Sequence, residues 1–261
     1  PVEVVGAGVD GDGDGVVNEV FVEDITATVI YVAGQTRPHT ELELDSLRRE
    51  LESLGPEGAE LARELELPLL TVEERRTIRR GREVFEQINC DACHVPQMRL
   101  RDTVFREPSE NPNFNQDARD AGLTPADTVS FDLAVDMLDN RIEVPGRFFR
   151  NLANLEVDDE GRGVVRLYSD LKRHDMGPGL AESIDESGHG SAVWMTKELW
   201  GIGATGQYLH DGRATTIPEA ILEHGGEAEG QAAAFRALPL EDQRDLVRFL
   251  QNLVILKVAE D

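Results

Sequence analysis

The sequence contains only two cysteines, Cys90 and Cys93, and His94 follows the second one directly. Two thiols at this spacing serve as a redox dithiol, as half of a metal site, or as attachment points for a haem. A thioredoxin-like dithiol needs a βαβ setting, and none is predicted before Cys90. A zinc site needs two further ligands at matched spacing, and the sequence has no second cysteine pair.

The order Cys-x-x-Cys-His is typical of covalent haem attachment. Two thiols one helical turn apart add to the two vinyl groups of a haem, which aims the adjacent histidine at the iron. We therefore predict one covalent haem c, bound through Cys90 and Cys93, with His94 as the proximal ligand. Because haem c is attached outside the cytoplasm, we expect a periplasmic or extracellular location.

Helical patterns flank the motif. Thr71 and Glu74 form a capping box, which predicts a helix that reaches about Ile88 and ends directly in the cysteine motif. A second capping box predicts a short helix from Thr216 that stops at two glycines. The last helix should begin near Pro239. It carries an amphipathic face that must be buried, made of Leu246, Phe249, Leu250 and Leu253.

Residues 95–200 are long and irregular, with one hairpin expected near residues 157–161. So much irregular chain is reasonable where it wraps a large prosthetic group that replaces part of the core. We predict a mainly α fold: a cytochrome c-like domain with long haem-wrapping loops and a small β-hairpin. This domain should span residues 71–261.

Residues 1–70 are expected to form a short acidic segment of loops and helices ahead of that domain. A β-leaning run extends from Val20 to Val32, and residues 41–66 have helical spacing with a break at Gly55 and Pro56. We find no internal repeat.

A stretch near the start resembles a calcium-binding loop, with oxygen ligands at positions 1, 3, 5 and 9 and glycine at position 6. The twelfth position is Phe21 in place of the bidentate glutamate, so Glu19 or Asp24 would have to substitute. The alternative is a flexible acidic turn. The candidate calcium ligands are Asp10, Asp12, Asp14, Asn18 and Glu19.

The formal net charge is −25, from 51 acidic and 26 basic residues. A surface this negative repels nucleic acid and anionic membranes, and it would attract a basic redox partner, for example another cytochrome. No apolar run approaches the roughly 18 residues that a membrane span needs. The chain does not begin with Met or a signal-like segment, so we expect a processed or truncated product.

Four ordered strings resemble the diheme thiol oxidoreductases, relatives of the bacterial diheme cytochrome c peroxidases and of the methylamine-utilisation diheme enzyme. The resemblance covers about residues 75–255, and it corresponds to the second, C-terminal haem domain of those proteins. The strings are YSDL at 168–171 with HDMGP at 174–178, LWGIG at 199–203, YLHDGRA at 208–214 and EAILEHGGE at 219–227.

In that superfamily the second haem takes its sixth ligand one short helix after the motif that contains His210. The residues alone leave several candidates for the sixth ligand: His174, Met176, His189, Met195, His210 and His224. The resemblance implies His224, opposite His94, with Met176 as the main rival. His210 and Arg213 could bond a haem propionate or hold a loop. Trp200, like Trp194, could pack on the porphyrin or fill core.

Iron with a ligand on both faces has no open position for peroxide, so such a haem passes electrons. The main prediction is an electron-transfer cytochrome, which could be a subunit of a larger redox complex. The alternative is the relay half of a diheme peroxidase or oxidoreductase whose catalytic haem lies elsewhere, because the sequence has one Cys-x-x-Cys-His only. A third reading is a structural subunit. Self-sufficient peroxidase activity is not expected.

Overall fold

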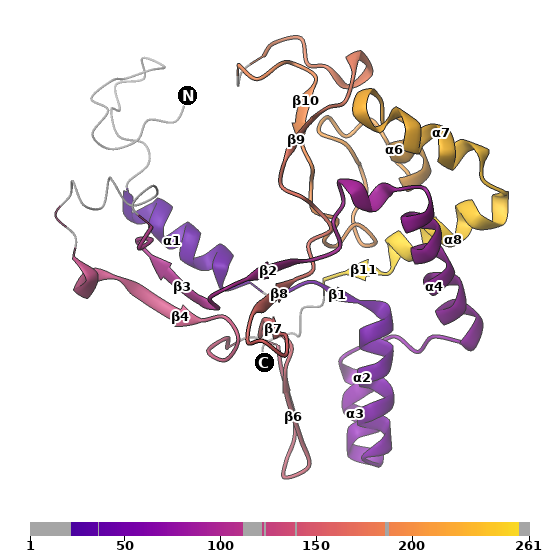
Figure 1. The fold of residues 1–261 in the computed structure, drawn as a ribbon. Helices are drawn as coiled ribbons and strands as arrows, with labels where there is room; N and C mark the ends of the chain where they lie inside the picture. Colours follow the sequence, from indigo (N-terminus) through magenta and orange to yellow (C-terminus); the bar gives the residue numbers. More distant parts are fainter. Residues whose placement is uncertain are drawn as a thin grey trace, which may run out of the picture. The chain divides into compact units, whose positions relative to one another are not determined.

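The computed structural model describes residues 22–35, 37–111, 122, 124–138, 140–185 and 188–255 (Figure 1). By its internal contacts the chain forms two compact units. The first contains Pro1–Thr36, Leu100–Arg141 and Asn151–Gly163, and the second contains Arg37–Arg99, Ile142–Arg150 and Val164–Asp261. The boundary after residue 70, between the acidic segment and the haem domain, stays a prediction. The predicted calcium loop, Asp10 to Glu19, lies outside the described residues.

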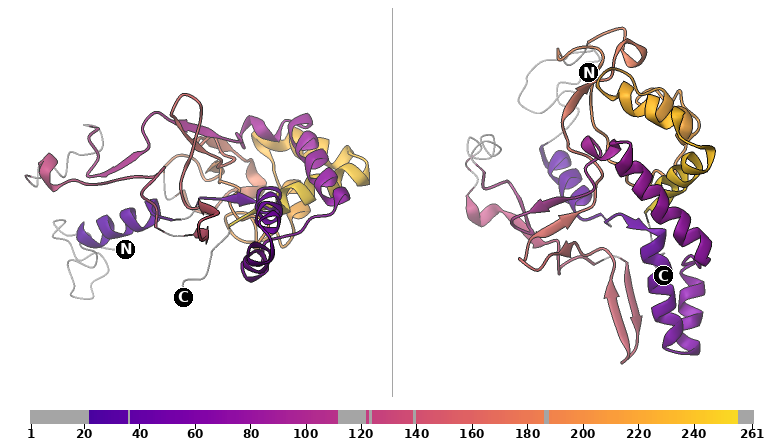
Figure 2. Two further views of the ribbon diagram at one scale, coloured as in Figure 1. Left: turned by 90° about the horizontal axis from the view of Figure 1, so that it is seen from below. Right: turned by 45° about the vertical axis from the view of Figure 1, so that its right-hand side comes forward.

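The second unit begins with two helices whose ends follow from local sequence. In α2 (Glu41–Ser53) the Thr40 hydroxyl accepts a hydrogen bond from the Glu43 amide. Gly55 adopts a φ of 104°, and Pro56 then opens α3 (Pro56–Glu64). The two helices lie side by side (Figure 2). The prediction of helical residues 41–66 with a break at Gly55 and Pro56 is therefore confirmed.

Helix α4 (Val72–Gln87) starts at the predicted capping box, with Thr71 and Glu74 bonding each other's backbone. It packs against α8 (Leu240–Gln251), the last helix of the described residues (Figure 1). Gly81 allows this crossing, because a Cβ there would lie 1.9 Å from the Asp245 carbonyl oxygen.

The core of this unit lies where α4 and α8 meet. Leu246, Phe249 and Leu250 of α8 are buried as predicted, and Leu253 is buried too but lies beyond the end of the helix. Aromatic rings of Phe85, Tyr168 and Phe249 pack on one another. Short helix α6 (Ile217–Leu222) also follows its predicted capping box. Helix α7 (Glu229–Ala237), preceded by a 3-10 turn (Gly226–Ala228), was not predicted.

Strands in the second unit are short. β1 (His39–Thr40) pairs antiparallel with β11 (Leu253–Val254), and β9 (Arg173–Asp175) pairs antiparallel with β10 (Val193–Met195). β5 (Arg141–Val144) and β6 (Phe148–Asn151), which belong to this unit except for Arg141 and Asn151, form a hairpin. His39 in β1 is only 2% exposed although its neighbours in sequence are polar, and it pairs with Val254 of β11.

In the first unit, α1 (Val22–Ala33) corrects the β-leaning prediction for Val20–Val32. The run is rich in β-branched residues, but a helix satisfies its backbone hydrogen bonds without a partner strand. β3 (Val104–Glu107) pairs with β4 (Val129–Asp132), and β7 (Glu156–Val157) leads into the predicted turn at residues 158–161. β2 (Met98–Leu100) and β8 (Gly163–Val165) lie where the chain passes from one unit to the other.

The described residues thus form a mixed fold in which helices predominate. The prediction of a mainly α fold with one hairpin understated the strands, because several two-stranded pairs interrupt residues 95–200. Pairs this short leave little alternating pattern in the sequence.

Candidate haem-binding site

The cysteine motif occupies one tight turn directly after α4. Asn89 adopts a left-handed φ of 63°, which ends the helix and starts a 3-10 turn at Cys90–Ala92. The amide of His94 then donates to the Cys90 carbonyl oxygen at 3.0 Å. Helix α4, which is fixed by its crossing with α8, therefore sets the direction in which the motif leaves the core.

Both cysteines are half-buried thiols that are not bonded to each other. Cys90 packs against the core, and burial, with the nearby Asp91 carboxylate, raises the pKa of its thiol to about 12. Burial also raises the pKa of Cys93. Thiols with raised pKa values are poor thiolate nucleophiles, so this environment does not suit a redox dithiol.

His94 is oriented by a backbone carbonyl. Its Nδ1 lies 3.0 Å from the carbonyl oxygen of Tyr168, a residue held in the left-handed region with φ 54°. A bond of this kind fixes the proton on Nδ1 whenever Nε2 binds a metal. Burial lowers the pKa of His94 to about 4, against an opposing effect of hydrogen bonds to the backbone of Tyr168 and Lys197.

His224 is oriented in the same way at the end of α6. Its Nδ1 lies 2.7 Å from the carbonyl oxygen of Ala220, one helical turn earlier. Burial lowers the pKa of this imidazole too. A neutral ring whose Nδ1–H is held by a carbonyl presents the Nε2 lone pair, as a metal ligand requires.

The two imidazoles face each other across a short gap, with ring centroids 6.5 Å apart and ring planes at 54°. A metal–imidazole bond of about 2 Å and the ~1.1 Å from ring centre to nitrogen put each ring centre about 3 Å from a metal. Two rings on opposite sides of one metal are therefore about 6 Å apart. The residues present fit a haem iron between His94 and His224, next to two thiols.

Glycines hold the chain that follows His224 close to another loop. Gly226 has a φ of 53°, and a Cβ on it would lie 2.1 Å from the Asp175 carbonyl oxygen. From the other side, a Cβ on Gly177 would lie 2.8 Å from the Gly226 amide nitrogen. The two loops touch through their backbones, which explains the glycines in both strings.

Met176, the rival ligand, lies in this contact. Its carbonyl oxygen would be 2.8 Å from a Cβ placed on Gly225, and the residue is half-buried. Its backbone thus has a packing role beside the residue that follows His224.

His210 and Arg213 make contacts within their own region. The His210 ring stacks on Trp194 at 3.9 Å between centroids, and its Nε2 lies 3.0 Å from a Glu182 carboxylate oxygen. Arg213 bonds Asp211 and donates to the Gly179 carbonyl oxygen. These contacts fit the loop-holding alternative, and a role toward a propionate stays a prediction.

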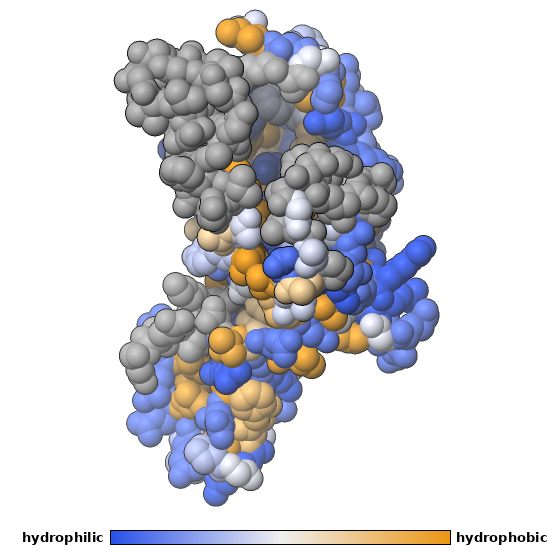
Figure 3. Space-filling view, turned by 90° about the vertical axis from the view of Figure 1, so that its left-hand side faces the viewer, coloured by the Kyte–Doolittle hydropathy of each residue, from blue (hydrophilic) through white to orange (hydrophobic). Residues whose placement is uncertain are grey.

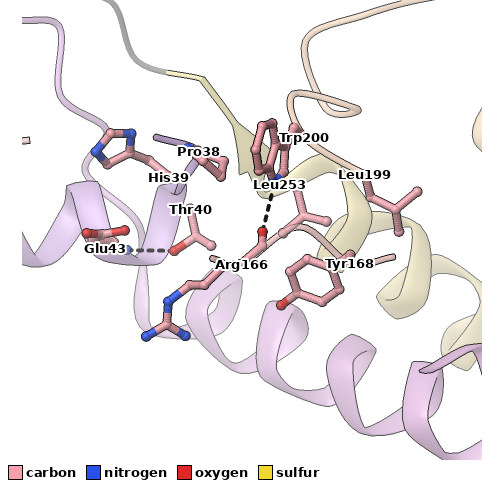
Figure 4. A pocket seen from close by; sticks show the side chains of 9 residues that line it. All are labelled: Pro38, His39, Thr40, Glu43, Arg166, Tyr168, Leu199, Trp200 and Leu253. Atoms are coloured by element: carbon pink, nitrogen blue, oxygen red, sulfur yellow. Dashed lines mark hydrogen bonds between the residues drawn. The ribbon is translucent and has the colours of Figure 1, made fainter. Parts of the chain in front are cut away.

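Trp200 lies at a different place in the second unit. It lines a hollow together with Tyr168, Leu199 and Leu253, and its indole nitrogen donates to the Arg166 carbonyl oxygen at 2.9 Å (Figure 4). Tyr168 connects this hollow to His94, because its ring lines the hollow and its carbonyl accepts from the imidazole. Packing of Trp200 on a porphyrin stays a prediction.

Sequence reasoning missed the residues that support the two histidines. In the sequence, Tyr168, Asp170 and Glu227 stand out only as parts of family strings, and His174 only as one of several candidates for the sixth ligand. A carbonyl acceptor leaves no signal in the side-chain sequence.

Within the described ranges no cluster of three or more His, Cys, Asp or Glu side chains is suited to hold a metal ion. No helix in the same ranges is long and apolar enough to cross a membrane.

Residues 161–253 match the model of a family described as "Di-haem oxidoreductase, putative peroxidase". The match includes Tyr168, His174 and His224 but begins after the cysteine motif. No curated protein and no solved structure shows significant similarity to the chain. The family match indicates a redox role and a haem cofactor.

Proposed function

We propose that the second unit binds one haem c and relays electrons, as the relay half of a di-haem oxidoreductase whose other haem lies outside these 261 residues. In this proposal Cys90 and Cys93 would hold the haem through thioethers, and the Nε2 atoms of His94 and His224 would bind its iron. When bound, the haem supplies an iron that stores one electron by changing between its ferric and ferrous forms.

The observation that carries the proposal is the facing pair of imidazoles, each with Nδ1 against a carbonyl. If both histidines bind the iron, neither peroxide nor oxygen has a place to bind. The chain's own contribution is to orient two neutral imidazoles through the carbonyl oxygens of Tyr168 and Ala220. Without a methionine ligand, we expect a lower potential than in cytochromes that have one.

A second candidate is a self-contained electron-transfer cytochrome. Two observations favour it: the two cysteines allow one covalent haem only, and the net charge of −25 suits docking to a basic partner. In Figure 3, hydrophilic residues and smaller groups of hydrophobic residues are both exposed. In both candidates we propose an extracytoplasmic location, since covalent haem attachment takes place there.

Absorption spectra of the purified holoprotein test the ligation. We expect one covalent haem per chain, six-coordinate and low-spin, that does not bind carbon monoxide readily. His224→Ala should open one axial position, giving a high-spin component that binds carbon monoxide. His189→Ala is the matched control, because His189 is an exposed histidine of the same unit. A His224→Ala protein that remains fully low-spin would refute the ligation, and a preparation without covalent haem would refute the function.

Haem stoichiometry separates the two candidates. The complex that contains this chain is isolated under native conditions, and haem and chain are counted. Two haems for each copy of this chain support the relay half of a di-haem oxidoreductase. One haem for each copy supports the self-contained cytochrome.

A further inference from the structure

His174 lies between two carboxylates that come from different segments of the second unit. Its Nε2 is 3.1 Å from an Asp170 carboxylate oxygen, and its Nδ1 is 2.9 Å from a Glu227 carboxylate oxygen. The other Glu227 oxygen accepts from the Asp175 amide at 2.9 Å. Both ring nitrogens are thus directed at acceptors.

This geometry determines the charge of the ring. A neutral imidazole has one N–H, and a carboxylate can only accept, so both contacts are hydrogen bonds only when His174 is an imidazolium. The hydrogen bond to Glu227, opposed by burial and supported by Asp170, accordingly raises the pKa of His174.

The two carboxylates belong to the segments that carry the facing histidines. Asp170 is two residues after Tyr168, whose carbonyl orients His94, and Glu227 is three residues after His224. Between the carboxylates the loops also touch directly at Gly177 and Gly226.

We propose that His174 is a positioning residue for the two axial histidines, because as an imidazolium it ties the segment that orients His94 to the segment that follows His224. This inference rests on the haem function proposed above. Loss of the charge releases one of the two carboxylates. The segment after His224 is then held less firmly, by the backbone contacts and the hydrogen bond from the Asp175 amide to Glu227, and His224 leaves the iron more often.

None of the charged groups around His174 can replace it as a hydrogen-bond donor to both carboxylates. Asp170 and Glu227 face its two nitrogens, and the exposed Lys172 lies beyond Asp170 with Nζ 4.0 Å from the carboxylate. Strand β10 places the uncharged Trp194 opposite His174 in the register. Among these neighbours, no group other than His174 is placed to bond both carboxylates.

Carbon monoxide binding to the reduced holoprotein tests the proposal, because carbon monoxide is uncharged and must displace His224. The rate is measured between about pH 5 and about pH 9, on either side of the ordinary histidine pKa. In the unmodified protein it should rise with pH as His174 loses its proton. The His174→Phe variant keeps a ring but has no hydrogen-bond donors. It should therefore bind carbon monoxide at least about tenfold faster than the unmodified protein. Its binding rate should not depend on pH in this range.

His189→Phe is the matched control and should keep the rate and the pH profile of the unmodified protein. Glu227→Gln provides a second variant should His174→Phe not fold, and it should also bind carbon monoxide faster. An unchanged rate and profile in His174→Phe, or in Glu227→Gln where that variant is used, overturns the inference while leaving bis-histidine ligation intact. Absence of covalent haem in the unmodified protein removes the proposed function and this inference together.

Discussion

His94 and His174 are imidazoles of the same unit, yet their surroundings shift their pKa values in opposite directions. Burial lowers the pKa of His94 to about 4, which keeps it neutral and able to bind metal. The hydrogen bond to Glu227, with that to Asp170, raises the pKa of His174 despite partial burial. One ring is therefore suited to be a ligand and the other to be a cation.

His174 should make stability depend on pH. Its pKa is raised above the unfolded value of about 6.5, so its stabilising effect is complete below about pH 6.5 and is lost as pH rises through the folded pKa. His174→Phe should therefore lower the free energy of unfolding more at pH 6 than at pH 9, as measured by urea titration. An equal loss at both pH values would contradict this assignment of charge.

The residues of the site differ in how far the sequence reveals them. Cys90, Cys93 and His94 form a contiguous motif whose spacing carries the chemistry, and the structure places them on one turn. His224 was implied by resemblance, and its distance from His94 could not be known before the fold. The Tyr168 carbonyl and the His174 cluster depend on tertiary contacts between segments about 50 to 75 residues apart in the chain, which local patterns do not encode.

At the scale of elements, the crossing of α4 and α8 depends on Gly81. A Cβ there would lie 1.9 Å from the Asp245 carbonyl oxygen, and the backbone of α8 cannot yield locally. Gly81→Ala should therefore lower the free energy of unfolding by about 2–3 kcal/mol, measured by urea titration of the holoprotein.

Gly230→Ala is the matched control for that substitution. Gly230 is also helical, in α7, and nothing lies within 4 Å of a Cβ placed on it. Alanine should stabilise this helix by up to about 1 kcal/mol. Equal stability of the two variants would show that the crossing tolerates a methyl group.

Elements with strong local signals were predicted well. The capping boxes at Thr71 and Thr216 and the break at Gly55 mark the starts of α4, α6 and α3. Two helices have weak local signals. The sequence of α7 is short and weakly patterned. That of α1 is rich in β-branched residues, which favour a strand over a helix in the sequence pattern.

At the scale of the whole molecule, the net charge of −25 should control encounters with partners. We expect electron transfer to a basic monohaem cytochrome to slow strongly as salt is added, because screening removes long-range attraction. Stopped-flow rates at increasing ionic strength measure this. With an acidic acceptor the rate should rise with salt, and a rate that is independent of salt for both acceptors would exclude electrostatic steering.

The backbone contact between residues 175–177 and 225–226 has a consequence for the rate of electron exchange itself. Glycines let the two loops touch without side chains between them, so no rotamer change is available to move one loop relative to the other. An axial ligand attached to such a contact would shift little when the iron gains or loses charge. Small reorganisation of the surroundings is what permits fast electron transfer once a partner has docked.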